Sequence, residues 1–185
     1  MAVMPRRFPV LSFWRARRGR KAAVAALKPY VEETRRVFGA DCGAVWEHPY
    51  AVGFLVNLIT LAAAEAADPE PTEALGLVQS ESWQALTGVP AELIGQKVSL
   101  LSIADDAHFI SGRDNAFIFF EALCNSQRDP LQLLTDTTAS DPSVFRSDTS
   151  RTPAQLAELW NELLHARIRP APAGLQLDPR GNPSG

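Results

Sequence analysis

The chain has 185 residues, 46% of them hydrophobic, which suits one globular domain with tails and is short for two domains. Its two cysteines, Cys42 and Cys124, lack CxxC or zinc-type spacing, so the sequence excludes a disulfide framework and predicts free thiols in a reducing compartment. The net charge of −3 hides a split, because residues 1–31 contain eight Lys/Arg and no acid, whereas the rest of the chain is strongly acidic. Such asymmetry indicates that the N-terminal end contacts a charged surface.

Residues 1–20 show no regular period, and we expect them to form a flexible basic arm. Arginines interleaved with aromatic rings suit an anionic lipid surface or the phosphates of single-stranded nucleic acid. The candidate residues for binding an anionic surface are Arg6, Arg7, Phe13, Trp14, Arg15, Arg17, Arg18, Arg20 and Lys21. The apolar run 8–14 is too short for a secretory signal, so the mature protein is expected to keep the arm. An organellar transit peptide, and an arm folded back onto its own acidic domain, remain open alternatives.

Two helices are predicted in the first third of the domain. The Ala-rich stretch from residue 21 begins the first, which Pro29 breaks or restarts and Gly39 closes. Pro49 then opens an apolar helix over residues 49–67, whose charge-free run 49–64 is shorter than the roughly 20 residues of a membrane span. This pattern favours a central core helix, with a single membrane span as the alternative.

Short helices separated by glycines are predicted in the middle of the chain. A helix after the loop at 68–71 ends at Gly88, and another over residues 90–94 ends at Gly95. Residues 97–103 are ambiguous, and without a partner strand they are expected to form a helix or an extended connector. A helix over 105–110 is expected to stop at Ser111-Gly112, and Asp114 to cap an aromatic helix whose Phe117, Phe119 and Phe120 belong to the core.

The C-terminal part begins with a short helical stretch around Leu131 and a long polar loop over residues 135–151. Thr152, Pro153 and Gln155 form a capping box that opens an amphipathic helix. Residues 167–185 are rich in Pro and Gly and are expected to be disordered.

The predicted fold is therefore all-α: a compact, bundle-like array of six to eight helices around a central apolar helix. Its expected division is a basic aromatic arm (1–20), a helical domain (21–166) and a disordered tail (167–185).

Two groups of side chains are candidates for chemistry. Asp105, Asp106, His108 and Asp114 have the ligand types of a divalent-metal site, but their spacing matches neither HExxH nor an EF-hand. Helix capping by Asp105 and Asp114 is the favoured interpretation of this cluster.

The second group centres on His48, which is a candidate general base with Cys42 or Cys124 as nucleophile. A helix cap or a partly buried surface histidine is favoured for His48. His165 is expected to complement the dipole at the end of its helix.

Glycine-rich phosphate loops and a GxSxG elbow are absent from the sequence. No cofactor is therefore expected, and an enzyme is the less favoured class.

The sequence favours a cytoplasmic helical module with an interaction or regulatory role and a protein partner. Its basic arm is expected to contact an acidic partner, an anionic membrane or nucleic acid. A helical enzyme or metal protein using residues 105–114, and a membrane-associated protein anchored by the arm or by 49–64, are the alternatives. The sequence does not predict an oligomeric state.

Overall fold

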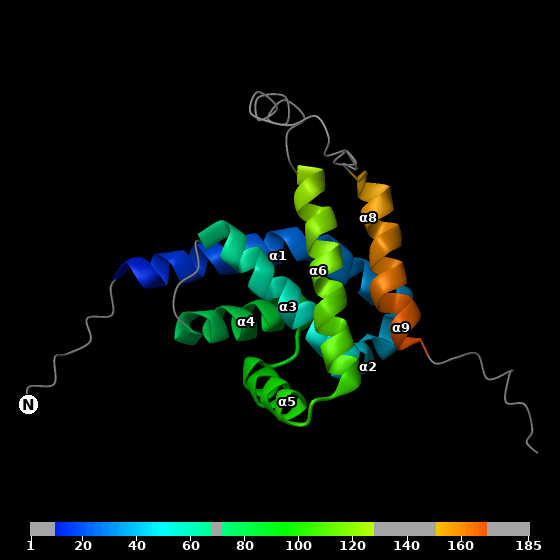
Figure 1. Cartoon of the computed structure of the whole chain (residues 1–185), viewed down its shortest axis with the longest axis horizontal. Helices are drawn as coiled ribbons and strands as arrows, with labels where there is room; N and C mark the ends of the chain where they lie inside the picture. Colours follow the sequence, from blue (N-terminus) through cyan, green and yellow to red (C-terminus); the bar gives the residue numbers. More distant parts are fainter. Residues whose placement is uncertain (1–9, 68–71, 128–150, 170–185) are drawn as a thin grey trace, which may run out of the picture.

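The computed structural model describes residues 10–67, 72–127 and 151–169, and the regular structure in these ranges is entirely helical (Figure 1). The described elements are α1 (Val10–Phe38), the 3₁₀ turn η1 (Gly39–Asp41), α2 (Cys42–Glu47), α3 (Pro49–Ala67), α4 (Thr72–Thr87), α5 (Ala91–Ile103), α6 (Ala107–Gln127), α8 (Pro153–Trp160), the π-helical turn η3 (Asn161–His165) and α9 (Ala166–Ile168). The predicted all-α fold is confirmed.

Helix α3 is the centre of this array, as the sequence predicts. It packs against α1, α4 and α6, and Phe54, Leu58 and Ile59 are fully buried. Among the described helices, α3 is long and apolar enough to cross a membrane, a criterion that the core helix of a soluble protein also meets. Burial on several sides explains why the helix is apolar around most of its circumference.

Helices α3 and α6 cross in close contact through one glycine on each. A Cβ atom built on Gly53 would collide with the Phe109 carbonyl, and one built on Gly112 would collide with the Tyr50 carbonyl. The predicted helix end at Ser111-Gly112 and the predicted cap at Asp114 are therefore wrong, because α6 continues through both. Gly112 lets two backbones approach and does not terminate a helix.

Helix α1 begins within the segment expected to be a flexible arm. It starts at Val10, and Gly19 packs on α3, where a Cβ would lie 3.1 Å from the Ala63 carbonyl oxygen. The helix thus begins ten residues before residue 20, the expected end of the arm, since tertiary packing extends it toward the N-terminus. Pro29 lies inside α1 on its exposed side and does not break it. Residues 1–9, including Arg6 and Arg7, lie outside the described residues.

Helix α5 includes the stretch that was ambiguous in sequence. Residues 97–103 are helical, and Gly95 lies inside α5 and does not end a helix. Gly39 and Gly88, in contrast, have positive φ angles of 53° and 80° and do close their helices as predicted. Only these two glycines adopt the left-handed backbone that a helix end favours, among the glycines of the described ranges.

Helix α8 completes the core. Its capping box is present as predicted, with Thr152 Oγ1 accepting from the Gln155 backbone N–H and the Gln155 side chain accepting from the Thr152 N–H. Trp160 joins an aromatic cluster, with ring centroids 5.3 Å from Tyr30 and Phe54 and 5.1 Å from Phe119. Helical structure continues to Ile168, two residues beyond the expected boundary. The helical stretch near Leu131, the expected loop up to residue 150 and the tail from residue 170 lie outside the described residues.

Candidate interaction surfaces

The first candidate surface is the solvent-facing side of α1. Trp14, Arg17, Arg18 and Lys21 are exposed and follow one another at i, i+3, i+4 and i+7, the spacing of a single helix face. We call these four residues the basic face. Trp14 has 59% of its surface exposed, whereas Trp46, Trp83 and Trp160 are buried. Arg15 and Arg20 are exposed beside this face, and the side chain of Phe13 is not described.

The opposite side of α1 fixes the basic face in space. Gly19 packs on Ala63, and Ala23 and Leu27 are fully buried one and two turns further along. The N-terminal half of α1 therefore presents its cations from a helix that packs on α3 and α4 from Ala16 onward (Figure 1).

Helix α4 flanks this end of α1. Arg20 forms an ion pair with Glu81 of α4, with 2.8 Å between nitrogen and oxygen. The two helices enclose a shallow cleft of about 310 Å³, lined by Ala16, Arg17, Arg20, Leu77, Val78 and Glu81. One basic residue expected in the arm thus contacts the protein's own acidic surface, while Arg17, which lines the same cleft, also belongs to the basic face.

The second candidate surface is apolar and lies on α5 and α6. Ile94 is the one buried residue of α5, although the helix is rich in Leu, Ile and Val. The exposed large apolar side chains of these helices, which we call the α5–α6 surface, are Leu93, Leu100, Ile103, Ile110, Phe117 and Ile118. Ile110, Phe117 and Ile118 share one side of α6, and a contiguous exposed apolar patch is a mark of an interaction site. The prediction that Phe117 belongs to the core is therefore wrong, since 48% of it is exposed.

The acidic–imidazole cluster at the start of α6 has structural roles. Asp106 caps the helix, with its Oδ1 accepting the Phe109 backbone N–H at 2.9 Å. Asp105, the residue expected to cap, instead precedes the helix with a φ of 47°. Asp114 is exposed two turns into α6. Within the described ranges, no three His, Cys, Asp or Glu side chains form a group that could hold a metal ion.

His48 caps the central helix, the role favoured from sequence. Its Nδ1 accepts the Tyr50 backbone N–H at 3.2 Å, and its ring lies edge-on to His108 with centroids 5.7 Å apart. Burial lowers the pKa of His48, and His108 and Lys97 lower it further while Asp106 opposes them. The imidazole is therefore held in its neutral, hydrogen-bond-accepting form.

The surroundings of Cys42 do not support a role as nucleophile. Cys42 is buried, and this burial raises the pKa of its thiol, which disfavours the reactive thiolate. Cys124 is half-buried on α6.

A buried polar cluster joins the first helix to the last, and sequence reasoning missed it. Thr34 Oγ1 lies 2.8 Å from His165 Nε2 and 2.9 Å from Trp160 Nε1. His165 is buried, and burial followed by the charge of Arg169 lowers its pKa. It therefore does not supply the cation that the predicted dipole interaction requires. The π-helical turn η3 contains His165, which also borders a shallow depression of about 410 Å³ next to Arg169.

Comparisons of the chain with protein-family models, with curated proteins and with solved structures find no match.

Proposed function

We propose that the protein is a small helical interaction module, acting in the cytoplasm or at a membrane surface, that holds an acidic partner through the basic face of α1. The observation that carries the proposal is the two-sidedness of α1. One side is buried through Gly19, Ala23 and Leu27, and the other presents Trp14 among cations.

The physical argument is preorganisation. A helix packed along its length holds its charges in one geometry, so binding does not have to order the backbone first. Residues 10–28 contain six Lys/Arg and no acid, which attracts acidic surfaces and speeds their approach. Trp14 adds an amphipathic ring at the N-terminal end of the basic face, of the type enriched at binding hot spots.

The α5–α6 surface supports the same class of function. An apolar helix with one buried residue leaves side chains such as Leu100 and Ile103 in water, which favours a partner that covers them. An enzyme using the Asp105–Asp114 region has less support, because Asp106 is engaged as a helix cap.

Trp14 provides the test. The other three tryptophans are buried, so acrylamide quenching and the red edge of the emission report mainly on Trp14. We expect poly-glutamate, used as an acidic polypeptide probe, to protect Trp14 from quenching and shift its emission to shorter wavelength. Phosphatidylcholine vesicles containing phosphatidylserine form a second arm, which distinguishes a membrane surface from an acidic protein.

The matched controls are two charge-neutralised variants. Arg17→Gln, Arg18→Gln and Lys21→Gln together should abolish the Trp14 response. Lys97→Gln, Arg113→Gln and Arg167→Gln remove three cations from other helices and should retain it. Equal responses from both variants, or no response to either probe by the wild type, would contradict the proposal.

A further inference from the structure

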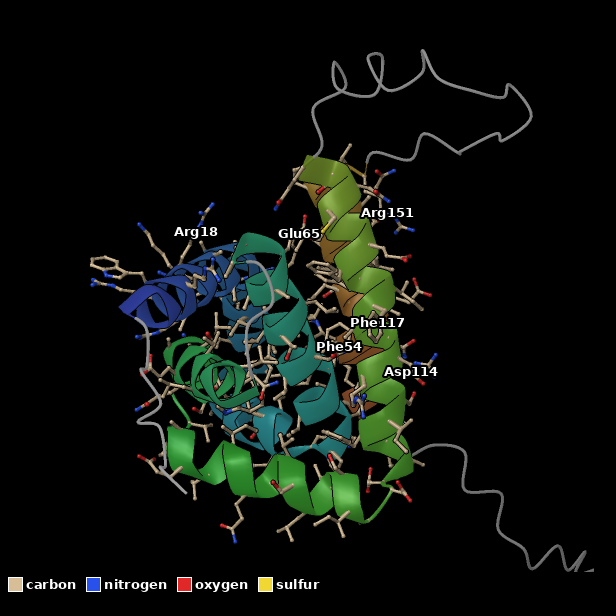
Figure 2. The ribbon with its side chains drawn as sticks, turned by 60° about the vertical axis from the view of Figure 1, so that its left-hand side comes forward. Arg18, Phe54, Glu65, Asp114, Phe117 and Arg151 are labelled. Carbon is tan, nitrogen blue, oxygen red and sulfur yellow. The ribbon has the colours of Figure 1, made fainter. Side chains whose placement is uncertain are left out.

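The outward face of α6 carries acidic and large apolar side chains, whereas the basic face carries cations. Ile110, Asp114, Phe117, Ile118 and Glu121 are all exposed and follow at i, i+4, i+7, i+8 and i+11, so they form one stripe along the helix. We call these residues the acidic–apolar stripe. Figure 2 shows Phe117 and Asp114 on the side of α6 turned away from Phe54 and α3. The stripe combines apolar side chains with two carboxylates, and the exposed Arg113 lies beside it, so this face of α6 carries a net charge of −1.

The basic face and this stripe are complementary in charge and in length. The basic face has three cations beside Trp14, and the stripe has Asp114 and Glu121 with the single cation Arg113 beside them. Lys21 is seven positions after Trp14, and Glu121 is seven positions after Asp114, so each row extends for about 10 Å along its helix. Trp14 on one surface and Phe117 on the other supply the aromatic contact at which binding energy concentrates.

These two surfaces cannot meet within one molecule. Gly19 and Ala23 hold α1 against the body, so its basic face points outward, and the stripe points outward from α6. Contact between them therefore requires two molecules.

We infer that the basic face of α1 in one copy docks on the acidic–apolar stripe of α6 in a second copy. This inference rests on the proposed function and names one acidic partner of the basic face. The two surfaces differ, so the contact is head-to-tail, and each copy offers one donor face and one acceptor face.

Charge reversal with rescue tests the inference. Arg18→Glu with Lys21→Glu reverses the basic face, and Asp114→Lys with Glu121→Lys reverses the stripe. By sedimentation velocity at low ionic strength, we expect the wild type to self-associate and each reversed variant to associate at least about tenfold more weakly. An equimolar mixture of the two variants should associate again, because the unchanged stripe of the first variant still matches the unchanged basic face of the second, and the two reversed faces also match each other.

A folding measurement and a control variant accompany the charge reversals. Circular dichroism confirms that each variant is folded, and Asp41→Lys, which reverses an exposed acid on η1, should associate like the wild type. A mixture that stays monomeric while the wild type associates would overturn the inference. Association that resists both reversals and is lost in Phe117→Ser would also overturn it, in favour of an apolar contact without α1.

A wild type that stays monomeric but binds poly-glutamate through the basic face would overturn this inference and leave the proposed function intact. A wild type that associates as expected but ignores poly-glutamate would support the self-contact and contradict the broader function.

Discussion

Thr34 makes three hydrogen bonds, and two of them connect α1 to the helical segment that contains Trp160 and His165. Its hydroxyl donates to the Tyr30 carbonyl at 3.0 Å and accepts from Trp160 Nε1. Because the single hydroxyl proton is used on Tyr30, His165 Nε2 carries the proton that it shares with Thr34 at 2.8 Å. The helical periodicity of the sequence identified the buried side of each helix, but it could not reveal a partner 131 residues away.

Thr34→Val should be strongly destabilising. It leaves the buried donors of Trp160 and His165 without an acceptor, at a cost of about 1–3 kcal/mol for each. Thr34→Ser keeps the hydroxyl and should lose only about 1 kcal/mol for the missing methyl group. Denaturant unfolding measures both, and equal losses would show that the hydrogen bonds contribute little.

Protonation of His165 should weaken the fold. Its folded pKa is lowered below the ordinary 6.5, first by burial and then by Arg169, while Glu33 opposes them. The unfolded chain therefore takes up this proton first, so stability is complete above about pH 6.5 and falls as the pH drops toward the folded pKa. His48 acts in the same direction. His165→Gln keeps a donor for Thr34 and should flatten the decline between about pH 7 and 5 in chemical denaturation.

At the scale of elements, the sequence correctly predicted two helix starts, but it wrongly predicted that two glycines end helices. Pro49 and the Thr152 capping box open helices as predicted, because local hydrogen bonding and a fixed φ determine those starts. Gly95 and Gly112 look like helix ends in sequence, yet both lie inside helices. The sequence does not distinguish a glycine that adopts a positive φ at a helix end from one that permits close packing inside a helix. Only the position of the neighbouring helix distinguishes the two roles.

Gly112→Ala and Gly95→Ala should therefore have opposite effects. A methyl group at residue 112 would collide with the Tyr50 carbonyl, so we expect a loss of about 1–3 kcal/mol or more. A methyl group at residue 95 meets nothing within 4 Å, and this variant should gain about 0.5–1 kcal/mol from higher helix propensity. Thermal melting followed at 222 nm compares them. Equal stability of the two variants would contradict the close α3–α6 crossing.

At the scale of the whole molecule, the sequence located the basic surface but not the apolar one. Charge asymmetry is visible in composition, and the predicted binding residues Arg17, Arg18 and Lys21 are exposed, while their binding to an anionic surface stays a prediction. Phe117 of α6 was expected in the core, but a sequence pattern cannot show whether another helix covers an apolar side chain. In the structure, Phe117 and its neighbour Ile118 are both exposed.

Removal of residues 151–185 should prevent cooperative folding of the remainder. The loss takes away Trp160 and the buried leucines around it, leaving Tyr30, Phe54 and Phe119 exposed to water. We expect the shortened chain to keep helical circular dichroism but lose its near-ultraviolet spectrum, and a peptide of residues 151–169 to restore that spectrum. A sharp thermal transition in the shortened chain alone would contradict this expectation.

The Thr34–Trp160 contact also determines when the protein becomes complete during its synthesis. The two residues are 126 positions apart, and ribosomes add about 5–20 residues per second. Trp160 is therefore synthesised on the order of 6–25 s after Thr34, and the helices between them are made during this interval. During that interval the nascent chain exposes an aromatic surface that chaperones recognise, and the translation rate of the later codons controls how long this exposure lasts.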